Sequence, residues 1–203
     1  RACAYCAVTS GVPGTLDLQE PLRLARTVER MQLRYAVITS VNRDDLPDGG
    51  AFIFAQCIKQ IRKRLPDCKI EVLIPDFQGN GDAIRTVIDA APDTLNHNIE
   101  TVRRMFDRVR PKGSFDQSLE LLAQVKSLDA SMVTKSGMMV GLGETWDEII
   151  ENMHALRSVG CDLLTIGQYL RPSEKHIALD RWYTPEEFEC LKREGESLGF
   201  KHV

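Results

Sequence analysis

The stretch Gly137–Tyr169, GMMVGLGETWDEIIENMHALRSVGCDLLTIGQY, decides the fold class. Two short apolar runs, Gly137–Gly141 and Leu163–Tyr169, flank a segment with helical character. That segment opens with Thr145 and Glu148 at capping-box spacing, which predicts a helix start. A strand, a helix and a second strand in this order indicate a βαβ unit with parallel strands.

The same alternation extends outward along the chain. Near-continuous apolar runs bounded by turn residues are typical of strands that are covered on both faces. Helical spacing of apolar residues lies between them, as in Ala51–Leu65 and Phe115–Val125, and Thr184 with Glu187 forms a second capping box. The remaining predicted strands are Tyr35–Val41, Lys69–Ile74 and Thr94–Ile99.

This order predicts a single α/β domain with a parallel sheet, either open and doubly wound or curled into a barrel. The pattern alone leaves both alternatives open. In both folds the chemistry gathers at the carboxyl ends of the strands.

Polar residues do cluster at these predicted strand ends. Burying them costs free energy unless they are paired, so they indicate a shared polar cavity. We interpret Asn96, Asn98 and Lys135 as site residues, because they lie within or beside apolar strands. Asp44 and Asp45 fit a turn with surface ion pairs, or contacts in a substrate cavity, better than a magnesium site. Three further polar residues are interpreted as helix caps: Ser114, Thr145 and Thr184.

The composition gives no support to several classes of function. The 203 residues carry a formal charge of −3, which gives no reason to expect nucleic-acid binding, and no apolar stretch predicts a membrane-spanning helix. The basic pairs Arg103-Arg104 and Arg108/Arg110 are interpreted as a solvated helix face. Six scattered cysteines do not form a disulfide framework, so a reducing compartment, the cytoplasm, is expected.

Arg1-Ala-Cys3-Ala-Tyr5-Cys6 holds the one closely spaced cysteine pair. A lone C-x-x-C fits a redox dithiol, half of a zinc site or other metal chemistry. The four histidines show no metal-ligand spacing, and the residues after Cys6 favour a loop over a thioredoxin-like helix.

RACAYC resembles the tail of the radical S-adenosylmethionine signature C-x-x-x-C-x-x-C in the form found in lipoyl synthases. The resemblance continues along essentially the whole chain in the family's order and spacing. Five further blocks carry it: Val37–Gly50 (VITSVNRDDLPDGG), Asn96–Val102 (NHNIETV), Arg108–Pro111 (RVRP), Thr134–Thr145 (TKSGMMVGLGET) and Leu164–Ser173 (LTIGQYLRPS).

The resemblance implies a radical SAM core, a partial TIM-type (β/α)6 barrel of parallel strands. It also implies a sulfurtransferase that inserts two sulfur atoms at C6 and C8 of an octanoyl-lysine, with sulfur from an auxiliary cluster. The implied cofactors are two [4Fe-4S] clusters and S-adenosyl-L-methionine. The implied partners are octanoylated carrier domains (2-oxoacid dehydrogenase E2 domains and glycine cleavage H protein) and reduced ferredoxin or flavodoxin. A cytoplasmic enzyme is expected, or one of an organellar matrix or stroma.

The resemblance also implies the site. Cys3 and Cys6 match the second and third ligands of the radical cluster, and are expected to be both metal-binding and catalytic. Tyr5 matches an aromatic near adenine. The remaining expected cofactor-binding residues are Thr39, Ser40 and Asn42 at the methionyl end, Asn98 and Glu100 at the ribose and methionine, Lys135 at a carboxylate, and Val140 and Gly141 at the adenine.

Some of the family's pattern is not found in these residues. The first signature cysteine, the N-terminal three-cysteine segment of the auxiliary cluster and the C-terminal R-S-S-Y tail are not present between Arg1 and Val203. We therefore expect the chain to be part of a longer protein. Three alternatives stay open: a degenerate carrier-binding paralogue, another radical SAM sulfurtransferase such as biotin synthase, and an unrelated zinc or dithiol barrel.

Overall fold

Five parallel strands alternate with seven α-helices in the computed structural model, which describes residues 1–203. The elements are α1 (Glu20–Arg30), β1 (Tyr35–Thr39), α2 (Ala51–Arg64), β2 (Lys69–Leu73), the 3-10 helix η1 (Phe77–Gly79), α3 (Gly81–Ile88), β3 (Thr94–Asn96), η2 (Arg103–Met105), α4 (Phe106–Val109), α5 (Phe115–Leu128), β4 (Val133–Val140), α6 (Trp146–Ser158), β5 (Leu163–Gln168) and α7 (Pro185–Ser197).

The chain divides into two compact units. Unit 1 comprises Arg1–Gly11, His97–Ala123 and Val133–Val203, and unit 2 comprises Val12–Asn96 and Gln124–Met132. The prediction of a single domain stays a prediction.

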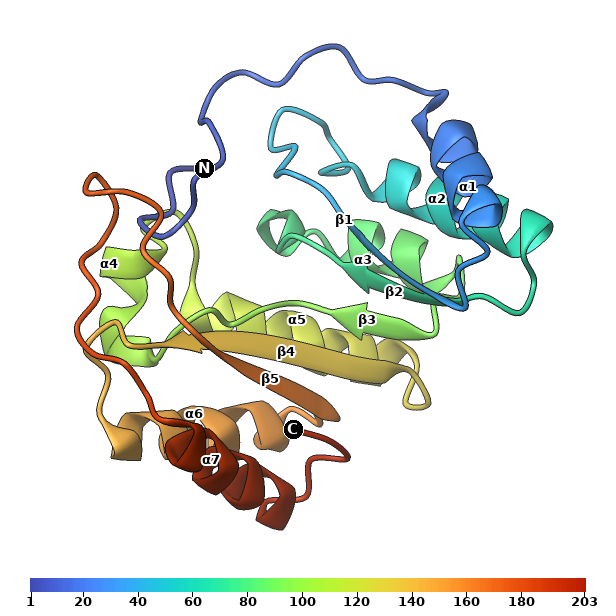
Figure 1. Cartoon of the computed structure of the whole chain (residues 1–203). Helices are drawn as coiled ribbons and strands as arrows, with labels where there is room; N and C mark the ends of the chain where they lie inside the picture. Colours follow the sequence, from blue (N-terminus) through green and yellow to red (C-terminus); the bar gives the residue numbers. More distant parts are fainter. The chain divides into compact units, whose positions relative to one another are not determined.

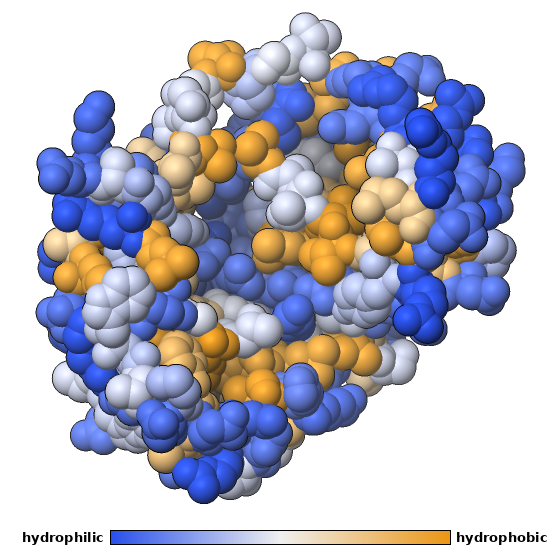
Figure 2. Space-filling model, viewed as in Figure 1, coloured by the Kyte–Doolittle hydropathy of each residue, from blue (hydrophilic) through white to orange (hydrophobic).

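Unit 2 is built on β1, β2 and β3, which pair in parallel in chain order. Helix α2 packs against both α1 and α3 (Figure 1). Alternate residues of β1 are buried, with Ala36 and Ile38 in the core, as a strand with one face covered by helices requires. The solvent side of α1 and α2 is largely hydrophilic (Figure 2), as expected for amphipathic helices on a sheet.

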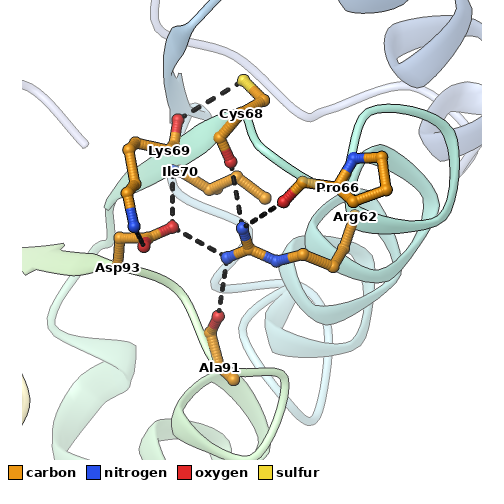
Figure 3. Close-up of polar contacts among 7 residues, drawn as sticks. All are labelled: Arg62, Pro66, Cys68, Lys69, Ile70, Ala91 and Asp93. Carbon is orange, nitrogen blue, oxygen red and sulfur yellow. Dashed lines mark hydrogen bonds and ion pairs between the residues drawn. The ribbon is translucent and has the colours of Figure 1, made fainter.

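A dense set of polar contacts surrounds Asp93 beside the start of β2 in unit 2 (Figure 3). The Asp93 carboxylate accepts hydrogen bonds from Arg62 (2.7 Å), Lys69 (2.9 Å) and the backbone N–H of Ile70 (2.9 Å). The Arg62 guanidinium also donates to the carbonyls of Cys68 (3.0 Å) and Ala91 (3.2 Å). One ion-paired arginine therefore joins the end of α2 to the turns that enter β2 and β3.

Unit 1 is built on β4 and β5, which pair in parallel with Gly137 opposite Thr165. Helices α6 and α7 pack side by side against these strands (Figure 1), and each starts at a complete capping box, as predicted from Thr145 and Thr184. His202 forms a parallel bridge with Leu163 on β5.

The predicted strands are confirmed, but two boundaries were wrong by three residues or more. The fourth strand starts at Val133 and not at Gly137, because Thr134 and Ser136 are fully buried inside it. Asp162 accepts a hydrogen bond from the Thr134 N–H, and Ser136 Oγ accepts one from the Ile99 N–H. The third strand ends at Asn96, although Glu100 pairs once more with Met138 of β4. Polar residues in a strand therefore did not mark its end, because tertiary partners satisfy them.

Candidate functional site

The candidate site is built around the loop of Cys3–Cys6 in unit 1. The Cys6 N–H donates to the Cys3 carbonyl (3.2 Å), so the backbone turns back between the two cysteines. Both thiols are free and half-buried. Ala4 fixes the loop from two sides: its N–H donates to Val109 (2.9 Å), and its carbonyl accepts from Ile177 (2.9 Å). No regular structure follows Cys6 until α1, which confirms the predicted loop.

Tyr5 points from this loop to Glu100, and the tyrosine hydroxyl is hydrogen-bonded to the carboxylate. Burial, together with the adjacent negative charge of Glu100, raises the pKa of Tyr5 well above its usual range. The phenol therefore stays protonated and donates its hydrogen to Glu100. This contact joins the cysteine loop to the polypeptide that lies beside β4.

Glu100 sits in an unusual environment. Its backbone φ is +71°, in the left-handed region that side chains other than glycine seldom adopt. Burial raises the pKa of Glu100 above its usual range, although the Arg110 guanidinium, Tyr5 and Asn98 act in the opposite direction. The protein therefore holds this carboxylate in place without fully compensating its charge, which is common at ligand sites.

Arg110 supplies the positive charge of the group. Its side chain donates to the carbonyl of Asn98 (3.1 Å) and lies over the ring of Phe106, and only 8% of the residue is exposed. Burial raises the pKa of Cys3, while Arg110 and Tyr5 act to lower it. The interpretation of Arg110 as part of a solvated face was wrong, because the turn after α4 directs it inward. For Arg103 and Arg104 that interpretation is confirmed, since both form exposed ion pairs.

Two glycines lie on one face of β4 and β5: Gly137 is buried beneath Asn98 and Thr165, and Gly167 is exposed. A Cβ on Gly137 would lie 2.8 Å from both Asn98 Oδ1 and Thr165 Oγ1, so only glycine lets these side chains approach the strand. A Cβ on Gly167 would meet nothing within 4 Å. Lys135 lies two positions before Gly137 on the same face and is half-buried.

The segment after β4 is stabilised by Glu144. Its carboxylate accepts from the N–H groups of Gly141 (2.6 Å) and Leu142 (2.9 Å). Gly141 has a φ of +99°, and a Cβ there would clash with Gln168 Nε2. Val140 is fully buried, and its carbonyl accepts from Gln168 and from the Tyr169 N–H. The predicted adenine-contacting segment is therefore a buried stretch of backbone held by hydrogen bonds.

The three remaining predicted residues, Thr39, Ser40 and Asn42, lie in unit 2. Thr39 and Ser40 line a cavity of about 210 Å³ between β1, α1 and α2, and the Thr39 hydroxyl donates to the Leu73 carbonyl (3.2 Å). Asn42 follows them and is half-buried. Thus Cys3, Tyr5, Asn98 and Glu100 are brought together in unit 1, whereas this trio belongs to the other unit.

The residues present fit an iron–sulfur cluster with a small polar ligand beside it. Two free thiols on one turn are the donors that such clusters prefer. The open position at Gly167, on the same face as Gly137, provides space, and Asn98 and Glu100 provide hydrogen-bonding groups for the ligand.

Sequence reasoning missed two residues of this site. Arg110 belongs to the quoted RVRP motif, which offered a signal for it. His176 has no such signal, because its side-chain contact with the carbonyl of Cys6 (3.1 Å) joins distant segments of the chain. Asn96, predicted to lie in the site, instead donates to Glu71 in unit 2 (3.1 Å).

Comparison with known proteins first gives the class. Residues 1–156 match the model of the radical SAM superfamily. The fold resembles that of methylornithine synthase (PylB), with a TM-score of 0.71 and 13% identity over 99% of this chain and 59% of that protein. It also resembles HydG, a maturase of the [FeFe]-hydrogenase, with a TM-score of 0.74 and 15% identity over 98% of this chain and 47% of that one. The fold is that of a radical SAM core, which confirms the predicted fold class.

Curated relatives then give the family. The lipoyl synthase of Rubrobacter xylanophilus is 57% identical over the whole chain and 63% of its own length. That of Caldanaerobacter subterraneus subsp. tengcongensis is 56% identical over the whole chain and 71% of its length. The chain belongs to the lipoyl synthase family. It spans somewhat less than two-thirds of the first of these relatives.

Proposed function

We propose that the whole protein is a lipoyl synthase that inserts two sulfur atoms at C6 and C8 of an octanoyl chain on a carrier lysine. The observation that carries the proposal is the junction of the Cys3–Cys6 loop with Glu100 through Tyr5, in a chain 57% identical to a curated lipoyl synthase. A paired thiol loop beside a polar, glycine-lined face suits a cluster that binds S-adenosylmethionine.

The residues of this chain would bind and orient the cofactors. Cys3 and Cys6 would ligate the radical cluster as thiolates. When bound, the cluster and S-adenosylmethionine supply the electron and the 5′-deoxyadenosyl radical that removes hydrogen from an unactivated C–H bond. Asn98 and Glu100 would offer hydrogen bonds to the ribose hydroxyls and the methionyl ammonium, and Lys135 would pair with the carboxylate.

The other contacts belong to the same proposal. Tyr5, Val140 and Gly141 would lie near adenine. Thr39, Ser40 and Asn42 would face the methionyl end.

The substrate partners would be octanoylated E2 and H-protein domains, and reduced ferredoxin or flavodoxin would supply electrons. The auxiliary cluster remains part of the proposal, and residues 1–203 contain no group of three or more His, Cys, Asp or Glu that could hold a metal ion. No helix of the chain is both long and apolar enough to span a bilayer. We propose the cytoplasm as the compartment.

Anaerobic iron–sulfur reconstitution of the full-length protein tests the proposal. With reductant, S-adenosylmethionine and an octanoyl-lysyl peptide, we expect 5′-deoxyadenosine together with a peptide that has gained two sulfur atoms. A Cys6→Ala variant should yield neither product. Cluster uptake and cofactor cleavage without a thiolated peptide would exclude lipoyl synthase. Absence of both cluster and cleavage would favour a degenerate carrier-binding protein.

A further inference from the structure

The segment that follows β5 lies against the Cys3–Cys6 loop in unit 1. The backbone N–H of Ile177 donates to the Ala4 carbonyl (2.9 Å), and the imidazole Nε2 of His176 lies 3.1 Å from the carbonyl oxygen of Cys6. The Ile177 contact holds Ala4, in the middle of the cysteine turn, and the His176 contact holds the carbonyl group of Cys6. The cysteine turn is therefore fixed by a segment that joins it only through tertiary contacts.

The direction of the His176 hydrogen bond follows from its partners. A carbonyl oxygen only accepts, so Nε2 must bear the hydrogen that it donates to Cys6. The other ring nitrogen, Nδ1, lies 2.8 Å from Ser173 Oγ, which can donate to a neutral imidazole or accept from a protonated one. The hydrogen bond to Cys6 is therefore present in either protonation state of the ring.

The imidazole is held in this orientation by its own neighbours. The Tyr169 hydroxyl donates to the Ile177 carbonyl (2.9 Å), and Tyr169 is almost completely buried. Arg171 Nε donates to the His176 carbonyl (3.0 Å), and the His176 N–H donates to the Ser173 carbonyl (3.0 Å). The backbone on both sides of the ring is thus hydrogen-bonded, and the ring nitrogens are held between Ser173 and Cys6.

We propose that His176 is a positioning residue for the cluster ligand Cys6, oriented by Ser173. This inference rests on the proposed function, because it treats Cys6 as a ligand. A hydrogen bond on the peptide of a ligand residue fixes the direction of its side chain, and outer contacts of this kind tune metal affinity and electronic properties. His176 itself does not touch the reacting atoms.

The test uses the full-length protein after anaerobic reconstitution. His176→Phe keeps a ring of similar size and removes the donor, whereas His176→Gln keeps an N–H at comparable reach. Ser173→Ala removes the orienting hydroxyl. His154→Phe is the matched control, because His154 is exposed on α6. The measurements are iron and sulfide per chain, the rate of iron loss to a chelator, and the electron paramagnetic resonance spectrum of the reduced cluster.

We expect His176→Phe to lose iron about tenfold faster than the native protein and to show a shifted spectrum. His176→Gln should recover most of the native behaviour, Ser173→Ala should fall between the two, and His154→Phe should match the native protein. If His176→Phe keeps the native rate and spectrum, or His176→Gln is no better than His176→Phe, the positioning role is wrong.

Failure of the proposed function gives a different result. A native protein that holds its cluster but never thiolates the peptide would overturn only the proposed activity, and the variant series would still decide the role of His176. A native protein that takes up no iron would overturn both.

Discussion

Asp93 in unit 2 and Glu100 in unit 1 are two carboxylates whose pKa values are shifted in opposite directions by their surroundings. Burial alone would raise the pKa of Asp93, but hydrogen bonds from Arg62, Lys69 and Ile70 outweigh it and lower the pKa to about 2. At Glu100 the balance is reversed, because burial outweighs Arg110, Tyr5 and Asn98 and the pKa is raised. Figure 3 shows how the protein surrounds Asp93 with donors.

The difference separates a structural carboxylate from a candidate ligand-binding one. The charge of Asp93 is satisfied by the fold, so its interactions contribute to stability. The ionised form of Glu100 costs stability, and Glu100 also lies at a left-handed φ, which adds strain. Residues that lower the stability of the ligand-free protein in this way are common at sites where a bound ligand supplies the missing interactions.

We expect the largest effect on stability from a substitution of Arg62, which breaks the polar contacts around Asp93. Arg62→Met removes the ion pair with Asp93 and the donors to three carbonyls. We expect a loss of about 2–3 kcal/mol in the free energy of unfolding, and not more, because the arginine is partly exposed to solvent. Urea unfolding of the full-length protein measures it. Lys63→Met, at the exposed neighbouring position of α2, is the control, and an equal loss in both variants would contradict a special role for Arg62.

The same chemical change at the two carboxylates should have opposite effects on stability. Asp93→Asn should lower the free energy of unfolding by about 2 kcal/mol, because its donors lose their charged acceptor. Glu100→Gln should leave that free energy unchanged or raise it at neutral pH, because it removes an undercompensated charge. Glu100→Gln should also weaken S-adenosylmethionine binding about tenfold, since the loss of one charged hydrogen bond is of this size.

Urea unfolding and anaerobic calorimetry on the reconstituted full-length protein measure these two effects. A Glu100→Gln protein that is destabilised as much as Asp93→Asn would show that Glu100 is also a structural residue.

The pH dependence sharpens the comparison. A lowered folded-state pKa means that the stability due to Asp93 is present above its ordinary value of 3.8 and is lost as the pH falls towards about 2. We expect that loss to be on the order of 1–2 kcal/mol and to be absent in Asp93→Asn. Glu100 has the opposite sign, because its folded-state pKa is raised: its contribution falls as the pH rises past the usual carboxyl range. Denaturant unfolding at a series of pH values, followed by tryptophan fluorescence, checks both slopes.

Two glycines on one face of β4 and β5, the buried Gly137 and the open Gly167, test whether a ligand lies there. Gly137→Ala would place a Cβ 2.8 Å from Asn98 and Thr165, so we expect a loss of about 1 kcal/mol in stability. Gly167→Ala enters open space and should leave stability unchanged. Both should weaken S-adenosylmethionine binding. If calorimetry finds native affinity for Gly167→Ala, the ligand does not use this face.

Local patterns in the sequence were sufficient for the strands, the helix caps and the cysteine loop, because each depends on residues close together in the chain. The capping boxes at Thr145 and Thr184 are examples of this kind. The resemblance added Glu100 and Asn98 to the expected site, and the structure brings both to the cysteine loop.

The remaining features depend on tertiary contacts that no local pattern encodes. Arg110 was read as solvated because its charge pattern is that of a surface helix, yet the turn after α4 buries it against Phe106. Thr134 and Ser136 were placed before the strand because their partners, Asp162 and Ile99, come from other segments. His176 lies far along the chain from Cys6 and could be found only after folding.

The smallest effect is expected at the rim of the Asp93 network. Lys69 donates to Asp93 (2.9 Å), but its side chain is 64% exposed, so water and salt screen the pair. Lys69→Ala should therefore cost about 0.5 kcal/mol or less in the free energy of unfolding, and added salt should reduce this cost further. In the Asp93→Asn background the same substitution should cost still less, because its partner has lost its charge. Urea unfolding of the two single variants and the double variant measures this coupling. A loss comparable to that of Arg62→Met would mean that the network depends on total charge, and not on the buried hydrogen bonds of one arginine.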